Sequence, residues 1–231
     1  MPSSIRTVLR QALRRLLHPL RNAPPETLAV HEAYARLADS YTAEAHNPFM
    51  RLEQAAMLEL LPDVRGKTAL DVACGTGRYL ELLRARGAAL AVGVDASSEM
   101  LRKARGLGAI VRGDLRALPV ASARFELVVC GLAVGHVAAL PAVLAEMGRA
   151  LRPGGTLVYS DFHPFAGLLG HARVFSVDGR AFAVEHHVHL YGAHQAACRA
   201  AGLEIEEVRE AMSATEPPFP AVLAIRARRR R

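Results

Sequence analysis

The stretch Ala69-Leu70-Asp71-Val72-Ala73-Cys74-Gly75-Thr76-Gly77-Arg78 decides how the rest of this 231-residue sequence is interpreted. It begins as a short apolar run, continues into a turn with two glycines, and leads into a helical pattern that starts at Arg78. Glycines at a strand-to-helix turn let a ligand approach the backbone closely. The stretch therefore predicts a strand, a ligand-binding turn and a helix of an open α/β sheet.

The flanking sequence repeats this alternation of short apolar runs and amphipathic helical patterns. Continuous apolar strands separated by helices are typical of a parallel sheet that is covered on both faces. A Pro-rich turn joins two late strand patterns and predicts an antiparallel hairpin at one edge. We therefore expect an α/β fold: a Rossmann-like, doubly wound, mostly parallel sheet with an antiparallel C-terminal hairpin strand and N-terminal helices. The expected strands are 68–73, 90–94, 109–112, 125–130, 156–160, 203–208 and 221–227, and the expected helices are 26–61 with an interruption at Asn47-Pro48, 78–86, 98–106, 140–151 and 193–201.

Composition places the chain among folded globular proteins. Hydrophobic residues make up 51% of it and charged residues 22%, so it has the material for a packed core. We expect neither a membrane span nor a signal peptide, because the sequence has no run of about 18 apolar residues and no apolar N-terminal core followed by a small-residue cleavage site. Cys74, Cys130 and Cys198 lie far apart. This spacing indicates a reducing compartment, and we expect a cytoplasmic protein.

The net charge of +7 is concentrated at the two ends of the chain. Five arginines lie within residues 1–22 and five within 226–231, which leaves 19 basic residues against all 22 acidic residues in between. A nucleic-acid-binding domain would carry its basic excess in the body, so we expect no nucleic-acid partner.

Apolar residues at helical spacing between the first arginines predict a basic amphipathic helix over residues 5–20. Two roles fit such a helix: weak contact with an anionic membrane surface, or coverage of an apolar patch on its own domain or on a dimer partner. The sequence is accordingly divided into a helix and linker, 1–25, and one domain, 26–231.

The acids around the glycine turn favour a cationic nucleoside over a dinucleotide. A dinucleotide fold uses a third glycine, but G-x-G-x-x-G counted from Gly75 places Leu80 in that position. Asp71 precedes the turn, where its charge repels a pyrophosphate and attracts a cation. Asp95 ends the next expected strand, twenty residues after Gly75, where a carboxylate accepts hydrogen bonds from ribose hydroxyls. S-adenosylmethionine, with its sulfonium and ammonium groups and no phosphate, fits this arrangement.

Five blocks of sequence resemble class I S-adenosylmethionine-dependent methyltransferases. The first, Asp71–Gly77, resembles their motif I. In addition, Tyr34–Tyr41 is similar to the N-terminal segment of the group that contains ubiquinone/menaquinone-biosynthesis and malonyl-carrier-protein methyltransferases. Five blocks in the right order over about 90 residues are far more specific than a single motif. The other four blocks are Val92–Leu101, Gly113–Pro119, Phe125–Cys130 and Leu151–Leu157.

The resemblance implies a role for each matching residue in holding S-adenosylmethionine. Asp71 and the backbone of residues 73–77 would surround the methionine part of the cofactor. Asp95 would bind the ribose hydroxyls, and Asp114 would accept the adenine amino group. The full implied set is Asp71, Ala73, Cys74, Gly75, Thr76, Gly77, Asp95, Asp114, Ala96 and Leu115 beside the adenine, and Gly131 beside the methyl group.

The cofactor motifs leave the catalytic residue open. Methyl transfer from a sulfonium requires above all alignment of the reacting atoms, and a base is needed only for an acceptor that keeps its proton. In similar enzymes the acceptor is selected by the N-terminal helices and by the insert after the fifth strand, here 26–62 and 162–194. The histidine-rich insert supports three interpretations: a polar flap, a general base with His163 as the catalytic candidate, or a metal site formed by His163, His187 and His189. We expect no metal, and we interpret His136 as mainly structural.

The sequence therefore predicts transfer of a methyl group from S-adenosylmethionine to an oxygen, nitrogen or activated carbon of a small-molecule acceptor. An acyl substrate on an acidic carrier protein is the alternative, because the basic ends would attract such a partner. Nucleic-acid methylation is disfavoured by the acidic body and by the absence of an Asn/Asp-Pro-Pro-aromatic tetrapeptide. A non-catalytic protein that senses the cofactor is also compatible with the motifs.

Overall fold

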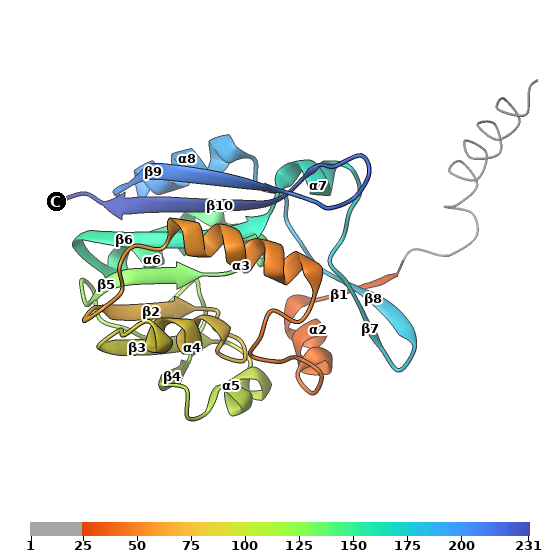
Figure 1. Cartoon of the computed structure of the whole chain (residues 1–231), viewed down its shortest axis with the longest axis horizontal. Helices are drawn as coiled ribbons and strands as arrows, with labels where there is room; N and C mark the ends of the chain where they lie inside the picture. The colour runs from red at the N-terminus through yellow and green to blue at the C-terminus, as the bar shows by residue number, and fades with distance from the viewer. Residues whose placement is uncertain (1–24) are drawn as a thin grey trace, which may run out of the picture.

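Seven strands form the main sheet of the computed structural model, which describes residues 25–231 (Figure 1). Their order is β4-β3-β2-β5-β6-β10-β9. The first five are mutually parallel, whereas β10 runs antiparallel to both β6 and β9. The bounds are β2 Thr68–Val72, β3 Leu90–Asp95, β4 Ala109–Arg112, β5 Phe125–Cys130, β6 Leu151–Phe162, β9 Leu203–Met212 and β10 Pro220–Arg229.

Helices cover both faces of this sheet, each through an apolar face of its own. On one face α3 and α4 pack against β2, β5 and β6 through a core that includes Met57, Leu60 and Leu80. On the other face α6 and α8 bury residues such as Leu144 and Met147 against the same strands. The predicted α/β, mostly parallel sheet with an antiparallel C-terminal hairpin is confirmed. The bounds are α3 Pro48–Leu60, α4 Arg78–Ala85, α5 Ser98–Ala104, α6 Leu140–Ala150 and α8 Tyr191–Ala200.

The N-terminal region differs from the expected interrupted helix. Asn47 caps α3 by accepting the Met50 N–H at 2.8 Å, and Pro48 occupies the first helical turn, where its missing donor costs nothing. Residues Glu26–Leu28 form a strand, β1, instead of helix, because they pair with a distant segment of the chain. The helical pattern gave no sign of that pairing. The expected helix over residues 5–20 lies outside the described residues.

A second, three-stranded sheet lies beside the carboxyl-end edge of the main one (Figure 1). Its order is β1-β8-β7, with β7 at Val174–Val177 and β8 at Arg180–Val184, and helix α2 (Val30–Leu37) contacts it. The sheet has a small core of its own that includes Leu28 and Phe182. The two regions that the resemblance assigns to acceptor selection, 26–62 and 162–194, therefore pair directly with one another. Within residues 25–231 no helix is long and apolar enough to cross a membrane.

Candidate active site

A cavity of about 1060 Å³ follows the carboxyl ends of the parallel strands. Its floor comes from the turns after β2, β3 and β5 and from the end of β6, and α2 and the second sheet contribute to its walls. In an open parallel sheet this edge is where ligands bind. Ten of the eleven residues implied as cofactor contacts line it: Asp71, Ala73, Cys74, Gly75, Thr76, Asp95, Ala96, Asp114, Leu115 and Gly131.

Gly77, the eleventh residue, lies beneath the turn and does not line the cavity. Its φ of 96° is in the left-handed region, and a Cβ added there would approach Leu107 Cδ1 to 2.6 Å. Glycine therefore lets the chain turn closely into α4 at this point. Gly77 shapes the turn, whereas its neighbours face the ligand space.

The turn between β2 and α4 is held by two carboxylates, of which Asp71 is buried and Asp95 is partly buried. Asp95 Oδ2 accepts the Gly75 N–H at 2.7 Å, and Asp95 Oδ1 accepts the Ser97 N–H at 2.8 Å. Asp71 Oδ2 accepts the Leu80 N–H at 3.1 Å. Burial raises the pKa of Asp95, although the N–H donors of Ser97 and Gly75 oppose the shift. These bonds leave lone pairs on both side chains, because a carboxylate offers about four.

Asp71 retains an acceptor that no described residue satisfies. Its Oδ1 is buried without a hydrogen-bond partner among residues 25–231. Burial raises the pKa of Asp71 well above its usual range. A buried, unpaired carboxylate oxygen carries a desolvation cost that a cationic ligand would relieve. The ammonium and sulfonium groups of S-adenosylmethionine have the charge that this site lacks.

At the far end of the turn region, Asp114 and Leu115 border the cavity together with Ala96. The Asp114 carboxylate also makes a two-pronged contact with Arg116, with Oδ1 2.9 Å from Nε and Oδ2 2.5 Å from Nη2. That guanidinium holds the pKa of Asp114 below its usual value. Asp114 thus stays ionised and acceptor-only, as an adenine amino group requires.

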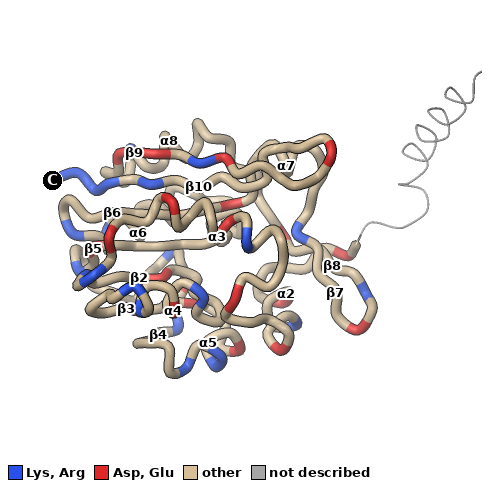
Figure 2. The backbone as a smooth tube through the Cα atoms, in the orientation of Figure 1, with Lys and Arg blue, Asp and Glu red and all other residues tan. Residues whose placement is uncertain are grey.

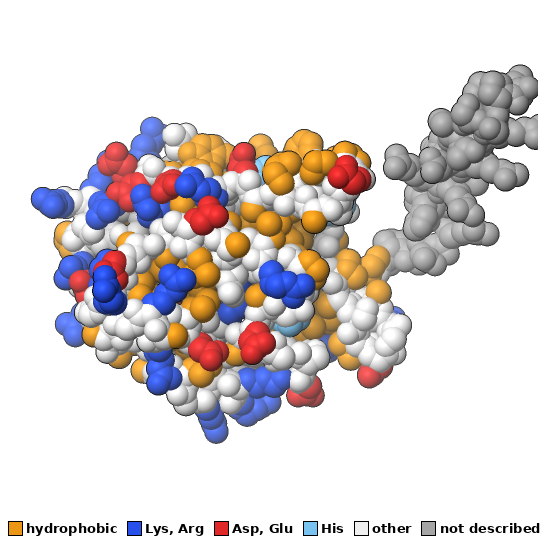
Figure 3. Space-filling view, in the orientation of Figure 1, with side chains coloured by type: hydrophobic (Ala, Val, Ile, Leu, Met, Phe, Trp, Pro, Cys, Tyr) orange, Lys and Arg blue, Asp and Glu red, His pale blue; other side chains and the backbone are white. Residues whose placement is uncertain are grey.

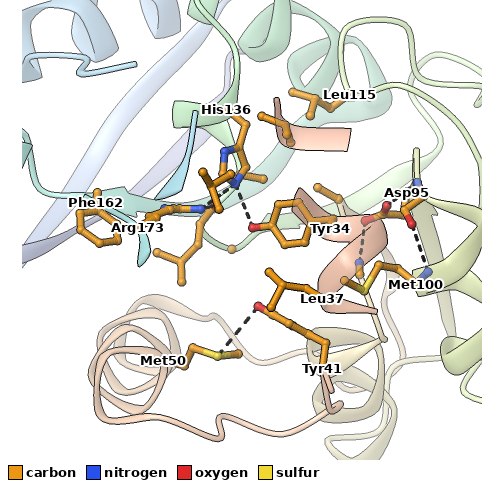
Figure 4. A pocket seen from close by; sticks show the side chains of 18 of the residues that line it. Tyr34, Leu37, Tyr41, Met50, Asp95, Met100, Leu115, His136, Phe162 and Arg173 are labelled. Carbon is orange, nitrogen blue, oxygen red and sulfur yellow. Dashed lines mark hydrogen bonds between the residues drawn. The ribbon is translucent and has the colours of Figure 1, made fainter. Parts of the chain in front are cut away.

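The opposite half of the cavity contains a cluster that the sequence did not reveal (Figure 4). Arg173, from the segment between α7 (Pro164–Leu168) and β7, extends its guanidinium to the end of β5 and to β6. Its Nη1 donates to Leu132 O at 2.5 Å and to His136 Nε2 at 2.7 Å, and its Nη2 lies 3.2 Å from Asp161 Oδ1. Its Nε has no hydrogen-bond partner among the described residues. Tyr34 Oη, from α2, lies 2.9 Å from the same His136 nitrogen.

His136 lines the cavity as a neutral imidazole. Arginine only donates, so Nε2 must be the acceptor, and the proton lies on Nδ1, which faces Glu185 O at 3.2 Å. Burial, followed by the charge of Arg173, lowers the pKa of His136 well below its usual range. The interpretation of His136 as mainly structural therefore misses its position at the acceptor end of the cavity.

Glu53 is a second residue that the sequence analysis missed. It is fully buried in α3, where its Oε1 accepts from Tyr79 Oη at 2.9 Å and from Ser160 Oγ at 2.5 Å, and its Oε2 lies 2.7 Å from Arg78 Nη1. The network ties α3 to α4 and β6 below Gly131, where an added Cβ would come within 3.1 Å of Glu53. A signal existed, since Glu53 falls on the apolar face of the helix, three residues after Met50 and four before Met57.

His163, the predicted catalytic residue, does not line the cavity. Its Nδ1 accepts the Phe165 N–H at 3.1 Å and caps α7, while its Nε2 lies 3.1 Å from Glu210 on β9. His163 lies just beyond the end of β6, and its bonds direct the imidazole to α7 and β9. His163 therefore holds α7 against the hairpin, and the geometry does not support it as the base.

The metal-site interpretation also lacks support in the structure. Among residues 25–231 no three His, Cys, Asp or Glu side chains gather closely enough to hold a metal ion. His189 bonds Val137 O at 2.8 Å, and His187 lies 3.7 Å from Glu185. The segment 185–190 is irregular and belongs to no helix or strand.

Comparisons with known proteins agree with this geometry. Residues 70–159 match the family model described as a methyltransferase domain. The chain contains an S-adenosylmethionine-dependent methyltransferase domain of class I. A solved S-adenosylmethionine-dependent methyltransferase of Mesorhizobium loti is 28% identical, with a TM-score of 0.66, over 77% of this chain and 98% of that one. A structure titled as the DhpI-SAM-HEP complex, 23% identical with a TM-score of 0.66 over 85% of this chain and 94% of that one, shares the fold.

The matches to curated relatives cover a smaller share of the relatives' own sequences. A malonyl-[acyl-carrier protein] O-methyltransferase of Enterobacter lignolyticus is 36% identical over 140 residues, 59% of this chain and 55% of the relative. One from Xylella fastidiosa is 34% identical over 149 residues, 60% of this chain and 50% of the relative. The chain thus spans about half the length of the curated relatives it matches.

We predict that Asp95→Ala weakens S-adenosylmethionine binding by about 1–3 kcal/mol, because it removes charged hydrogen bonds to the ligand and frees the Gly75 N–H. Titration calorimetry measures the change. Asp63→Ala is the matched control, since Asp63 pairs with exposed Arg65 away from the cavity. An Asp95 variant that binds as tightly as the control would contradict the assignment of this carboxylate.

Proposed function

We propose that this chain transfers the methyl group of S-adenosylmethionine to a carboxylate oxygen of an acyl acceptor. The observation that carries the proposal is the Arg173 guanidinium, which is largely buried and lines the same cavity as Asp71 and Asp95. A buried guanidinium with an unsatisfied N–H is a binding group for a carboxylate, which it recognises through charge and paired hydrogen bonds.

The charges around Arg173 favour an anionic acceptor near neutral pH. Among residues 25–231, Asp161 is the one acid paired with Arg173. Burial raises the pKa of Asp161 to about 7, although Arg173 opposes the shift. His136 and His186 are neutral, because burial lowers the pKa of His136 and brings that of His186 to about 3. The Tyr34 hydroxyl keeps its proton, since burial raises its pKa. The positive charge of Arg173 is therefore only partly compensated.

A carboxylate acceptor also fits the bonding around Arg173, whose guanidinium already engages His136 and Asp161. The bound cofactor supplies an electrophilic methyl group and its own leaving group. A carboxylate is already ionised at neutral pH and gives up no proton on methylation, so no general base is required. His136 Nε2 already accepts from Arg173, and together they would orient the acceptor. The protein contributes position, charge and exclusion of water.

The names of the curated relatives suggest which carboxylate to test first. Those relatives are called malonyl-[acyl-carrier protein] O-methyltransferases, and a malonyl thioester has a free carboxylate at its far end. We therefore propose a carrier-bound acyl group with a terminal carboxylate as the first acceptor, with a small free carboxylic acid as the alternative.

The structure changes the expected role of the two basic ends in meeting such a carrier. Because β10 is antiparallel to β6, its amino end lies at the cavity edge and its arginine-rich carboxyl end lies at the opposite edge (Figure 2). Arg226 and Arg228 are also paired with Glu206. We propose that the C-terminal arginines do not dock the carrier, and that the N-terminal residues 1–22 remain the candidates.

The test is transfer of labelled methyl from S-adenosylmethionine to malonyl-acyl carrier protein and to malonyl-CoA. We expect an alkali-labile methyl ester as the product.

Arg173→Gln should raise the acceptor KM on the order of 10- to 100-fold, because it removes a charged hydrogen bond to the acceptor, and should leave S-adenosylmethionine affinity unchanged. Arg173→Lys should recover part of this loss. Arg180→Gln is the control, because Arg180 lies at the start of β8 and pairs with Glu26 at the surface. An alkali-stable methyl product, or an unchanged acceptor KM in Arg173→Gln, would contradict the proposal.

The acceptor KM should also rise as the pH rises through 7. Below that pH Asp161 is protonated and Arg173 is free to attract the carboxylate, whereas above it the Asp161 anion competes. We expect a change of up to about tenfold between pH 6 and 8.5, which corresponds to one unit of pKa. Asp161→Asn should give a KM that is low and nearly flat over this range. Steady-state kinetics in which the acceptor KM depends on pH equally in the unaltered protein and in Asp161→Asn would contradict the role of Asp161.

A further inference from the structure

The cavity continues past Arg173, away from the cofactor half. Strand order is β3-β2-β5-β6-β10, so the carboxylates at the ends of β2 and β3 lie on one side of β5, and β6 and β10 lie on the other. Adjacent strands are about 4.8 Å apart, which places β10 roughly 14 Å from β2. We name the part of the cavity above β6 and β10 the side arm, and it is lined by Phe49, Phe162, Ala166, His171, Phe219 and Ala221.

Aromatic side chains form most of the side-arm wall. The rings of Phe49 and Phe162 lie 4.4 Å apart between centroids, and those of His171 and Phe219 lie 4.5 Å apart and nearly parallel. None of the six side-arm residues is an Asp, Glu, Lys or Arg. The side arm therefore offers a mostly apolar surface, in which His171 is the one polar side chain among the six.

Arg173 marks the inner end of the side arm. Its guanidinium carbon lies 5.1 Å from the centroid of Phe162, and its Nη1 contacts Leu132, the residue after Gly131. A carboxylate on Arg173 would thus have the methyl-donor position on one side and the aromatic wall on the other. The side arm gives space for the chain attached to that carboxylate.

The size of the cavity agrees with two ligands. Pockets for one small ligand usually measure about 300–1000 Å³, and this one reaches about 1060 Å³. At the outer end of the side arm α7 contributes Ala166 to the wall and leaves Phe165, Leu168 and Leu169 exposed. Hydrophobic side chains gather on the surface around α7 (Figure 3).

We infer that the side arm binds an apolar chain of several carbons attached to the acceptor carboxylate. The inference rests on the proposed function, since it assigns the carboxylate to Arg173. Burying each added methylene against the aromatic wall should tighten binding about fourfold until the side arm is full.

The experiment is a chain-length series of straight saturated monocarboxylates, from butyrate to dodecanoate, titrated into the full chain in the presence of S-adenosylhomocysteine. We expect affinity to rise about fourfold per methylene over several carbons and then level off.

Phe219→Ala should reduce this gain for the long acids and leave butyrate binding unchanged, and Phe219→Leu should restore most of the gain. Phe165→Ala is the control, because Phe165 is close in the fold but does not line the cavity.

The outcomes separate the two proposals. Carboxylates that bind in an Arg173-dependent way with no dependence on chain length, or a gain that Phe219→Ala leaves intact, would overturn the side arm and leave the proposed function standing. Failure of every carboxylate to bind, including the malonyl acceptors, would overturn both.

Discussion

The contact on which the whole site depends is the bond between the Asp95 carboxylate and the Gly75 N–H, 2.7 Å long. It joins the end of β3 to the turn after β2, and with the Asp71–Leu80 bond it fixes the shape of a backbone that no regular element stabilises. The carboxylates that shape the turn also face the cavity. Their burial is costly without a cationic or hydroxyl-bearing ligand, so one arrangement explains both the fold of the turn and its choice of ligand.

Sheet order then separates two kinds of charge along one cavity. Acids stand at the ends of β2 and β3, where a sulfonium nucleoside fits, and a cation, Arg173, stands beyond β5, where an anionic acceptor fits. Between them Gly131 leaves space above the buried Glu53 network. Donor and acceptor would approach one another from opposite sides of β5, which is the alignment that an in-line displacement needs.

The sequence predicted those parts of the site in which the residues that contact the ligand space also carry a local sequence pattern. The strand–turn–helix at residues 69–78 and the acids at 71 and 95 follow from strand pattern, glycine placement and chain order, and the structure brings them together. Arg173 could not be found in this way, because it lies on an irregular segment between α7 and β7, where no periodic pattern shows the direction of a side chain. His163 looked well placed after a strand, but its imidazole caps α7 and lies 3.1 Å from Glu210. Glu53, by contrast, was visible as an acid on the apolar face of a helix.

The most direct test of this division of the cavity is a crystal structure with S-adenosylhomocysteine bound. The account predicts ribose hydroxyls within hydrogen-bonding distance of Asp95 and a sulfur atom beside Gly131 that faces the Arg173 guanidinium. A nucleoside seated elsewhere, or a sulfur directed away from Arg173, would contradict it.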